Sequence, residues 1–107
     1  MPVHNKLVRD KIPEIIEKTG KNFKTRILSD EEYIKELKEK SFEELREYME
    51  AADRDNALEE LADVLEIVNA FAVYHQSSME EIEQIRKKKS EERGGFKEKV
   101  YLIAVED

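Results

Sequence analysis

Residues 56–73 read NALEELADVLEIVNAFAV, and this stretch decides the fold. From Leu58 to Val73, apolar side chains recur on most sides of a helix, which is typical of a helix that is largely buried. The same stretch also carries four polar residues: Glu60, Asp63, Glu66 and Asn69. Because a buried carboxylate is costly unless its charge is compensated, this helix is expected to have a compensating partner.

The helix expected before it carries a matching pair of acids. Its apolar stripe consists of Ile34, Leu37, Leu45, Tyr48 and Ala52. A helix turns by about 100° per residue, so Glu44 projects within about 20° of Leu37 and therefore into the stripe, with Glu47 at its border. Residues three apart share one face of a helix. A short turn at 53–56 would therefore bring the pair Glu44/Glu47 close to the pair on the next helix.

The whole chain predicts a mainly α fold in a single domain over 1–107, with four helices and one or two short strands near the ends. For a first helix over 11–19, Asp10 is the expected N-cap, Pro13 lies in the first turn and Gly20 is the stop. Three pairs have the spacing of a capping box: Ser29 with Glu32 begins a helix that runs to about Ala52, Asn56 with Glu59 begins the third helix, and Ser78 with Glu81 begins the fourth. The glycines at 94–95 end the fourth helix. Segments 24–28 and 99–105 contain β-branched residues and are expected to be strands.

Four carboxylates in one small volume cannot all stay ionised without counter-charge. Both helices offer few cations on those faces, so a divalent metal ion is the expected compensation. The chain has no Cys and only two His, so the ligands are oxygens, which suit Mg²⁺, with Mn²⁺ as the alternative. The competing interpretation is that each pair lies on a solvated face and forms ordinary salt bridges.

The combined pattern is E-E-x-x-E at Glu43, Glu44 and Glu47, then twelve residues, then E-x-x-D at Glu60 and Asp63. It resembles the metal-binding signature of the MazG-like all-α nucleoside triphosphate pyrophosphohydrolases. Segments 5–16 and 86–96 look like the small phosphoribosyl-ATP pyrophosphohydrolase-like branch of that superfamily. The resemblance implies a four-helix MazG-like bundle completed by oligomerisation, as a homodimer or homotetramer.

By this resemblance, Mg²⁺ grips a nucleoside triphosphate that is cleaved between the α and β phosphates to a monophosphate and pyrophosphate. The implied role is house-cleaning of non-canonical or excess nucleotides. The implied metal ligands are Glu44, Glu47, Glu60 and Asp63, with Glu44 or Glu47 as the alternative residue that activates water. The candidates for phosphate contact, which could equally form a solvated basic face, are Lys6, Arg9, Lys11, Lys88, Lys89 and Arg93.

Two other functions compete with this one. The first is phosphoribosyl-ATP hydrolysis in histidine biosynthesis, and the second is a non-catalytic helical interaction module in which Glu44 and Asp63 pair with cations of another subunit. The net charge of -7 argues against general binding to the nucleic-acid backbone. No apolar run approaches the roughly 20 residues of a membrane span, and the first residues lack the apolar centre of a secretory signal. A cytoplasmic protein without membrane or nucleic-acid partners is expected.

Overall fold

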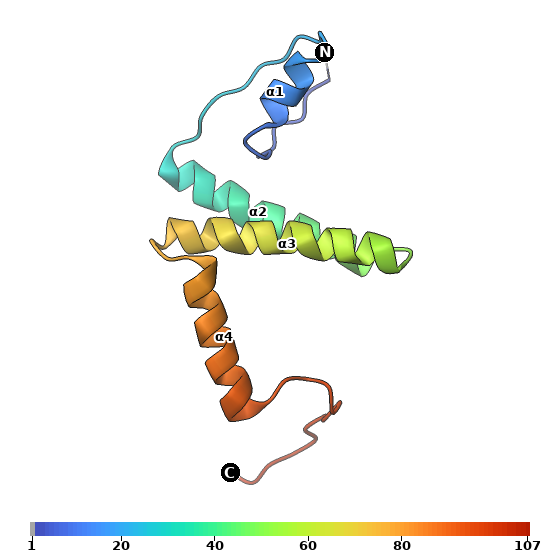
Figure 1. The fold of residues 1–107 in the computed structure, drawn as a ribbon, viewed down its shortest axis with the longest axis vertical. Helices are drawn as coiled ribbons and strands as arrows, with labels where there is room; N and C mark the ends of the chain where they lie inside the picture. Colours follow the sequence, from blue (N-terminus) through green and yellow to red (C-terminus); the bar gives the residue numbers. More distant parts are fainter. Residues whose placement is uncertain (1) are drawn as a thin grey trace.

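The computed structural model describes residues 2–107 and is mainly helical, as predicted. Its helices are α1 (Ile12–Glu17), α2 (Asp30–Met49), α3 (Arg54–Tyr74) and α4 (Met79–Arg93). The predicted strands at 24–28 and 99–105 are wrong, because neither segment has regular secondary structure. A strand needs a partner for its backbone hydrogen bonds. The two segments lie on opposite sides of the α2–α3 pair, and no strand lies beside either of them in residues 2–107 (Figure 1).

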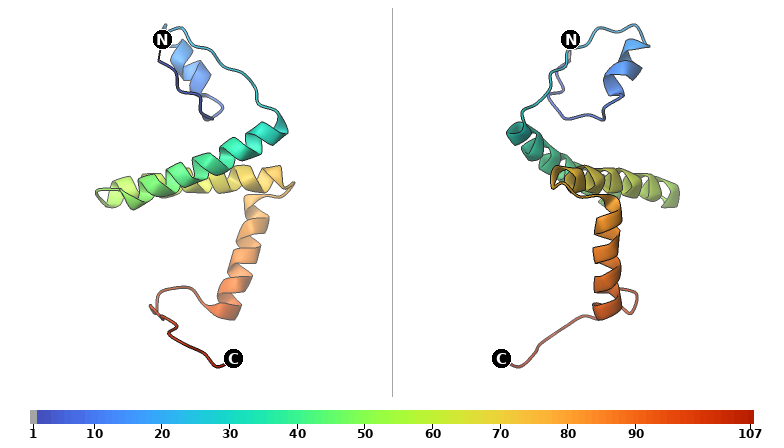
Figure 2. Two further views of the ribbon diagram at one scale, coloured as in Figure 1. Left: turned by 180° about the vertical axis from the view of Figure 1, so that it is seen from behind. Right: turned by 60° about the vertical axis from the view of Figure 1, so that its left-hand side comes forward.

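Helices α2 and α3 form an antiparallel hairpin and pack side by side (Figures 1 and 2). Leu37 of α2 is buried in this hairpin together with Ile67 and Ala72 of α3. The hairpin ends differ slightly from expectation, since α2 ends at Met49 rather than near Ala52. The hairpin is therefore the packed unit of the chain and carries all four predicted metal ligands.

The other two helices extend away from the hairpin. Helix α4 contacts α3 near their junction and then runs outward, and α1 lies off the opposite side (Figure 1). The molecule is elongated, with extents of 61 × 35 × 27 Å. Within one chain the four helices do not close into a bundle, so the predicted bundle requires a second copy and stays a prediction. Among the described residues, no helix combines the length and apolar character needed to cross a membrane.

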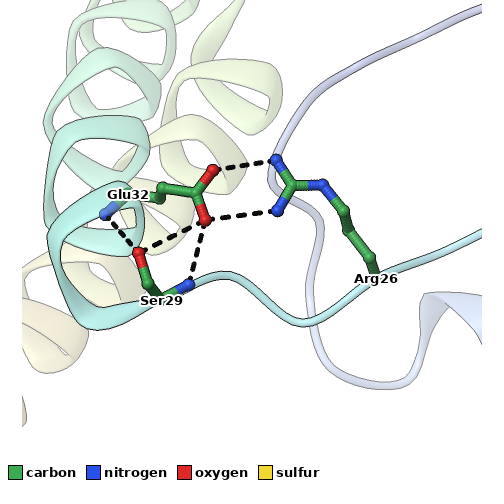
Figure 3. Close-up of polar contacts among 3 residues, drawn as sticks. All are labelled: Arg26, Ser29 and Glu32. Carbon is green, nitrogen blue, oxygen red and sulfur yellow. Dashed lines mark hydrogen bonds and ion pairs between the residues drawn. The ribbon is translucent and has the colours of Figure 1, made fainter.

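The start of α2 is held by the capping box that the sequence predicts (Figure 3). The Ser29 hydroxyl accepts from the Glu32 backbone N–H at 3.2 Å, and the Glu32 carboxylate accepts from the Ser29 N–H at 3.1 Å. Arg26 adds an ion pair to Glu32 at 2.9 Å. These contacts lower the pKa of Glu32 to about 2, and the contact with Arg26 makes the largest contribution. Their contribution to stability is therefore complete above pH 4.5 and is lost as the pH falls towards 2.

The caps of the other helices confirm some predictions and correct others. Ser78 caps α4 by accepting from the Glu81 N–H at 3.1 Å, and Gly94 ends that helix with a φ of 81°. Asp10 does not cap α1: the cap position is Lys11, without a side-chain cap, and Asp10 lies one residue too early. Asn56 does not cap α3 either. The cap is Asp53, whose carboxylate accepts from the Asn56 backbone N–H at 2.9 Å.

The corrected cap of α3 can be tested by two substitutions. Asp53→Ala removes the acceptor for the first turn and should lower the free energy of unfolding by about 1 kcal/mol. Asn56→Ala leaves that hydrogen bond in place, because only the backbone of Asn56 takes part, and should change stability by less than about 0.5 kcal/mol. Urea unfolding followed by circular dichroism measures both. Equal losses in the two variants would contradict the assignment.

Candidate metal site

Three of the four predicted ligands converge in the hairpin. Glu44 and Glu47 lie one turn apart on α2, and Glu60 lies on the neighbouring turn of α3. One carboxylate oxygen from each of the three residues lies within 4.8 Å of the other two. We call these three residues the carboxylate cluster. Its convergence follows from the spacing of the acids and from the antiparallel pairing of the two helices.

Glu44 is the least solvated member of the carboxylate cluster. The residue is only 8% exposed, and its Oε1 lies 3.5 Å from Lys40 Nζ. Its other oxygen, Oε2, is buried without a hydrogen-bond partner, and so is Oε2 of Glu60. A buried charged oxygen without a partner is unfavourable. The cluster therefore has unused capacity to bind a cation.

Two members of the cluster, Glu44 and Glu47, have raised pKa values. Burial raises the pKa of Glu44, and the charges of Glu47 and Asp63 add to the increase, while Lys40 opposes it. Partial desolvation likewise raises the pKa of Glu47, with the Glu60 carboxyl as the next cause. Both carboxylates are thus harder to ionise in the folded chain than in water. A bound divalent cation would reverse this by favouring their charged forms.

Asp63, the fourth predicted ligand, is not in the cluster. Its Oδ1 accepts a hydrogen bond from Arg9 Nη2 at 2.6 Å, which makes an ion pair between α3 and the segment before α1. Asp63 nevertheless lies near the cluster, since its charge contributes to the raised pKa of Glu44. The structure therefore gives this residue an internal cation as its partner.

The predicted phosphate contacts fall in three places. Lys11 and Arg9 line a pocket of about 410 Å³ between residues 7–11 and the hairpin, and Lys6 lines a separate pocket of about 520 Å³ against α2. Neither pocket includes a member of the carboxylate cluster, although Lys40 lines both. The other three candidates, Lys88, Lys89 and Arg93, are exposed on the outward-running part of α4 and are not brought to the cluster within one chain.

Lys40 is the functional residue that sequence reasoning missed. The sequence was expected to place few cations on the inner faces of the two helices, yet Lys40 is largely buried beside Glu44. Its position four residues before Glu44 is the signal that identifies it, because residues at this spacing are neighbours on a helix. Lys40 compensates one oxygen of Glu44, whereas the other oxygen of Glu44 and Oε2 of Glu60 are buried without a hydrogen-bond partner.

The arrangement suits a hard divalent cation. Its donors are carboxylate oxygens only, they come from two paired helices, and two of them are buried with no protein partner. Mg²⁺ prefers such oxygens and normally binds one or two carboxylates together with water and phosphate. The residues present could therefore hold a divalent metal ion.

Comparison with known proteins finds an uncharacterised relative. The chain is 49% identical over 53 residues to an uncharacterised protein of Mycolicibacterium smegmatis. The matched region is 50% of this chain and spans about half, 54%, of that protein. No family model matches the chain, and no solved structure matches it.

The raised pKa of Glu44 predicts an unusual pH dependence for the metal-free protein. Ionised Glu44 is disfavoured in the folded state, so it lowers stability above its folded pKa, and this penalty disappears as the pH falls towards 4.5. In the presence of a chelator, Glu44→Gln should be more stable than wild type by about 1 kcal/mol at pH 7. The difference should shrink as the pH falls towards 4.5.

Denaturant unfolding at several pH values measures this difference. Glu39→Gln, on the exposed part of the same helix, is the matched control and should follow wild type at every pH. A Glu44→Gln variant less stable than wild type at pH 7 would contradict the prediction.

Proposed function

We propose that this chain is a Mg²⁺-dependent nucleoside triphosphate pyrophosphohydrolase of the MazG-like kind. It would cleave between the α and β phosphates and release a nucleoside monophosphate and pyrophosphate. The observation that carries the proposal is the carboxylate cluster: one oxygen from each of Glu44, Glu47 and Glu60 lies within 4.8 Å of the others. The sequence pattern that resembles the MazG-like signature contains the same three residues.

The reaction needs a site that binds a polyanion in a chain of net charge -7. Bound Mg²⁺ would neutralise phosphate charge and lower the pKa of the attacking water. Glu44 and Glu60, whose Oε2 atoms are buried and unpartnered, are suited to hold the ion. Arg9, Lys11 and Lys40 place further positive charge at the pocket beside the hairpin, where we assign part of the phosphate chain of the substrate.

Glu47 is the better candidate for the residue that accepts a proton from water. It is exposed, whereas Glu44 is buried and already paired with Lys40. A general base has to reach the water that it deprotonates, and the exposed position of Glu47 allows this. The water oxygen attacks one phosphorus of the α–β anhydride, the bridging P–O bond breaks, and Glu47 takes the proton.

The non-catalytic interaction module keeps one observation in its favour. Glu44 and Asp63 both have cationic partners, Lys40 and Arg9, although these belong to the same chain and not to another subunit. Glu47 and Glu60 have no ion pair among the described residues, which the module leaves unexplained. Magnesium binding separates the two functions, because the module requires none.

Pyrophosphate release tests the proposed activity. Wild type, Glu60→Gln and Glu59→Gln would be assayed on canonical and modified nucleoside triphosphates and on phosphoribosyl-ATP, with and without Mg²⁺. Glu60→Gln should lose more than the roughly 10–100-fold typical of residues that only support a metal ligand. Glu59→Gln, at the neighbouring exposed position, should retain activity.

The outcomes of this assay are distinct. Mg²⁺-dependent release that is lost in Glu60→Gln supports the proposal, and the preferred substrate separates house-cleaning from phosphoribosyl-ATP hydrolysis. No cleavage, together with no binding of Mg²⁺ in calorimetry, would replace the enzyme with the interaction module.

We also propose that the chain acts as a homodimer or homotetramer. The hairpin leaves an apolar stripe on each helix, formed by Phe42, Leu45 and Met49 on α2 and by Leu58, Leu61 and Leu65 on α3. All six side chains are exposed, and both stripes have the spacing i, i+3, i+7 of a helix face that packs against a partner. Exposed apolar surface of this extent is typical of an interaction site.

Sedimentation tests the oligomeric state. Wild type should sediment as a dimer or tetramer at tens of micromolar, and Leu65→Glu should shift it towards the monomer, because the new charge would be buried in the interface. Circular dichroism of the variant should show retained helix. A wild-type protein that sediments only as a monomer at these concentrations would refute the proposal.

A further inference from the structure

Asp63, which is held in an ion pair by Arg9, lies one helical turn from Glu60 of the carboxylate cluster. Asp63 follows Glu60 by three positions on α3, so the two side chains leave the same face of the helix, with Cβ atoms about 5–6 Å apart. Arg9 Nη2 holds Asp63 Oδ1 at 2.6 Å. A modest side-chain rotation, without movement of the helix, would bring the Asp63 carboxylate towards the cluster.

This ion pair is of the kind that is easily exchanged. The Arg9 side chain is 56% exposed and that of Asp63 is 39% exposed. Water screens such pairs, so they contribute little to stability. A divalent ion at the cluster has twice the charge of a guanidinium and gains further ligands from Glu44 and Glu60, which have buried oxygens without partners. The metal is therefore the stronger competitor for Asp63.

The cluster itself has an independent mark of a binding site. The Glu44 residue is 8% exposed, and its Oε2 is buried without any hydrogen-bond partner. A cation bound there would satisfy this oxygen and attract the nearby charge of Asp63.

We propose that Arg9 and a divalent metal ion compete for Asp63, so that metal binding at the carboxylate cluster releases the Arg9 guanidinium to bind a phosphate of the substrate. This inference rests on the proposed function, which supplies the metal and the phosphate. In the metal-free protein, Arg9 is the counter-ion of Asp63. In the metal-loaded protein, it binds a phosphate of the substrate. A guanidinium suits both roles, because its planar fork fits carboxylate and phosphate alike.

The position of Arg9 makes the exchange productive. Residues 7–11 form one wall of the pocket beside the hairpin, and Lys40, which pairs with Glu44, stands on the opposite wall. A guanidinium released from Asp63 stays at this pocket, which Lys40 connects to the cluster through its contact with Glu44. Metal binding thereby adds a phosphate ligand to the site, and by thermodynamic linkage phosphate binding strengthens metal binding.

Two affinities measured on three proteins test this exchange. Calorimetry would give the affinity for Mg²⁺ alone, and then for inorganic pyrophosphate in the presence of Mg²⁺. The variants are Arg9→Gln and, as a matched control, Arg26→Gln. Arg26 is also an exposed arginine in an ion pair, with Glu32 at 2.9 Å, but it belongs to the start of α2 (Figure 3).

Arg9→Gln should shift the two affinities in opposite directions. It should bind Mg²⁺ about 2- to 5-fold more tightly, because Asp63 has lost its competitor. It should bind pyrophosphate roughly tenfold more weakly, because a charged hydrogen-bond donor is missing. Arg26→Gln should match wild type in both. In wild type, Mg²⁺ should also accelerate hydrogen exchange at residues 5–11.

Several results would overturn the inference. If Arg9→Gln binds Mg²⁺ no more tightly than Arg26→Gln does, or if both of its affinities fall, Arg9 only stabilises the fold. Wild type that binds no Mg²⁺ would refute the inference together with the metal site. Opposite shifts in a protein that cleaves no nucleotide would instead support the exchange and refute the proposed activity.

Discussion

Glu44 is buried between α2 and α3 with one carboxylate oxygen paired to Lys40 and the other unpaired, and this imbalance of charge is the constraint on which the site depends. The hairpin cannot bury Leu37 and Ile67 without also bringing Glu60 of α3 close to Glu44 and Glu47 of α2. The packing of the two helices therefore also concentrates negative charge between them. The metal-free hairpin tolerates the charge by raising the pKa of Glu44 and of Glu47.

Five of the cationic side chains form two groups, which differ in whether they lie near this negative charge. Lys40 and Arg9 compensate Glu44 and Asp63 directly, within the hairpin and across to the N-terminal segment. Lys88, Lys89 and Arg93 lie on α4, which runs away from the hairpin (Figure 2). Only the first group can act on the cluster within one chain. The second could approach a cluster only in an assembly of several copies.

The same arrangement explains why a single chain looks incomplete. Among residues 2–107, only three apolar residues are buried, Leu37, Ile67 and Ala72, while both hairpin helices keep exposed apolar stripes. A helix of ordinary composition gains most of its stability from packing rather than from intrinsic propensity. Helix α4 has little packing of its own, and the proposed oligomer would supply contacts that a single chain lacks.

The sequence by itself determined the features that depend on near neighbours. Ser29, Ser78 and Gly94 act as predicted because caps are local hydrogen bonds and backbone conformations. The convergence of Glu44, Glu47 and Glu60 was also predictable, since helical spacing and a short turn suffice to bring them together. Where two local candidates competed, sequence reasoning failed: Asp53 and not Asn56 caps α3, because the helix begins earlier in the turn.

Only the tertiary structure decided the contacts between distant segments. Segments 24–28 and 99–105 have the composition of strands but no neighbouring strand, and strand formation depends on a partner rather than on composition. The pairing of Asp63 with Arg9, 54 residues away, separates Asp63 from the other three acids. No spacing rule predicts which exposed carboxylate an arginine of another segment will reach, because that choice is made by how the N-terminal segment lies against the hairpin.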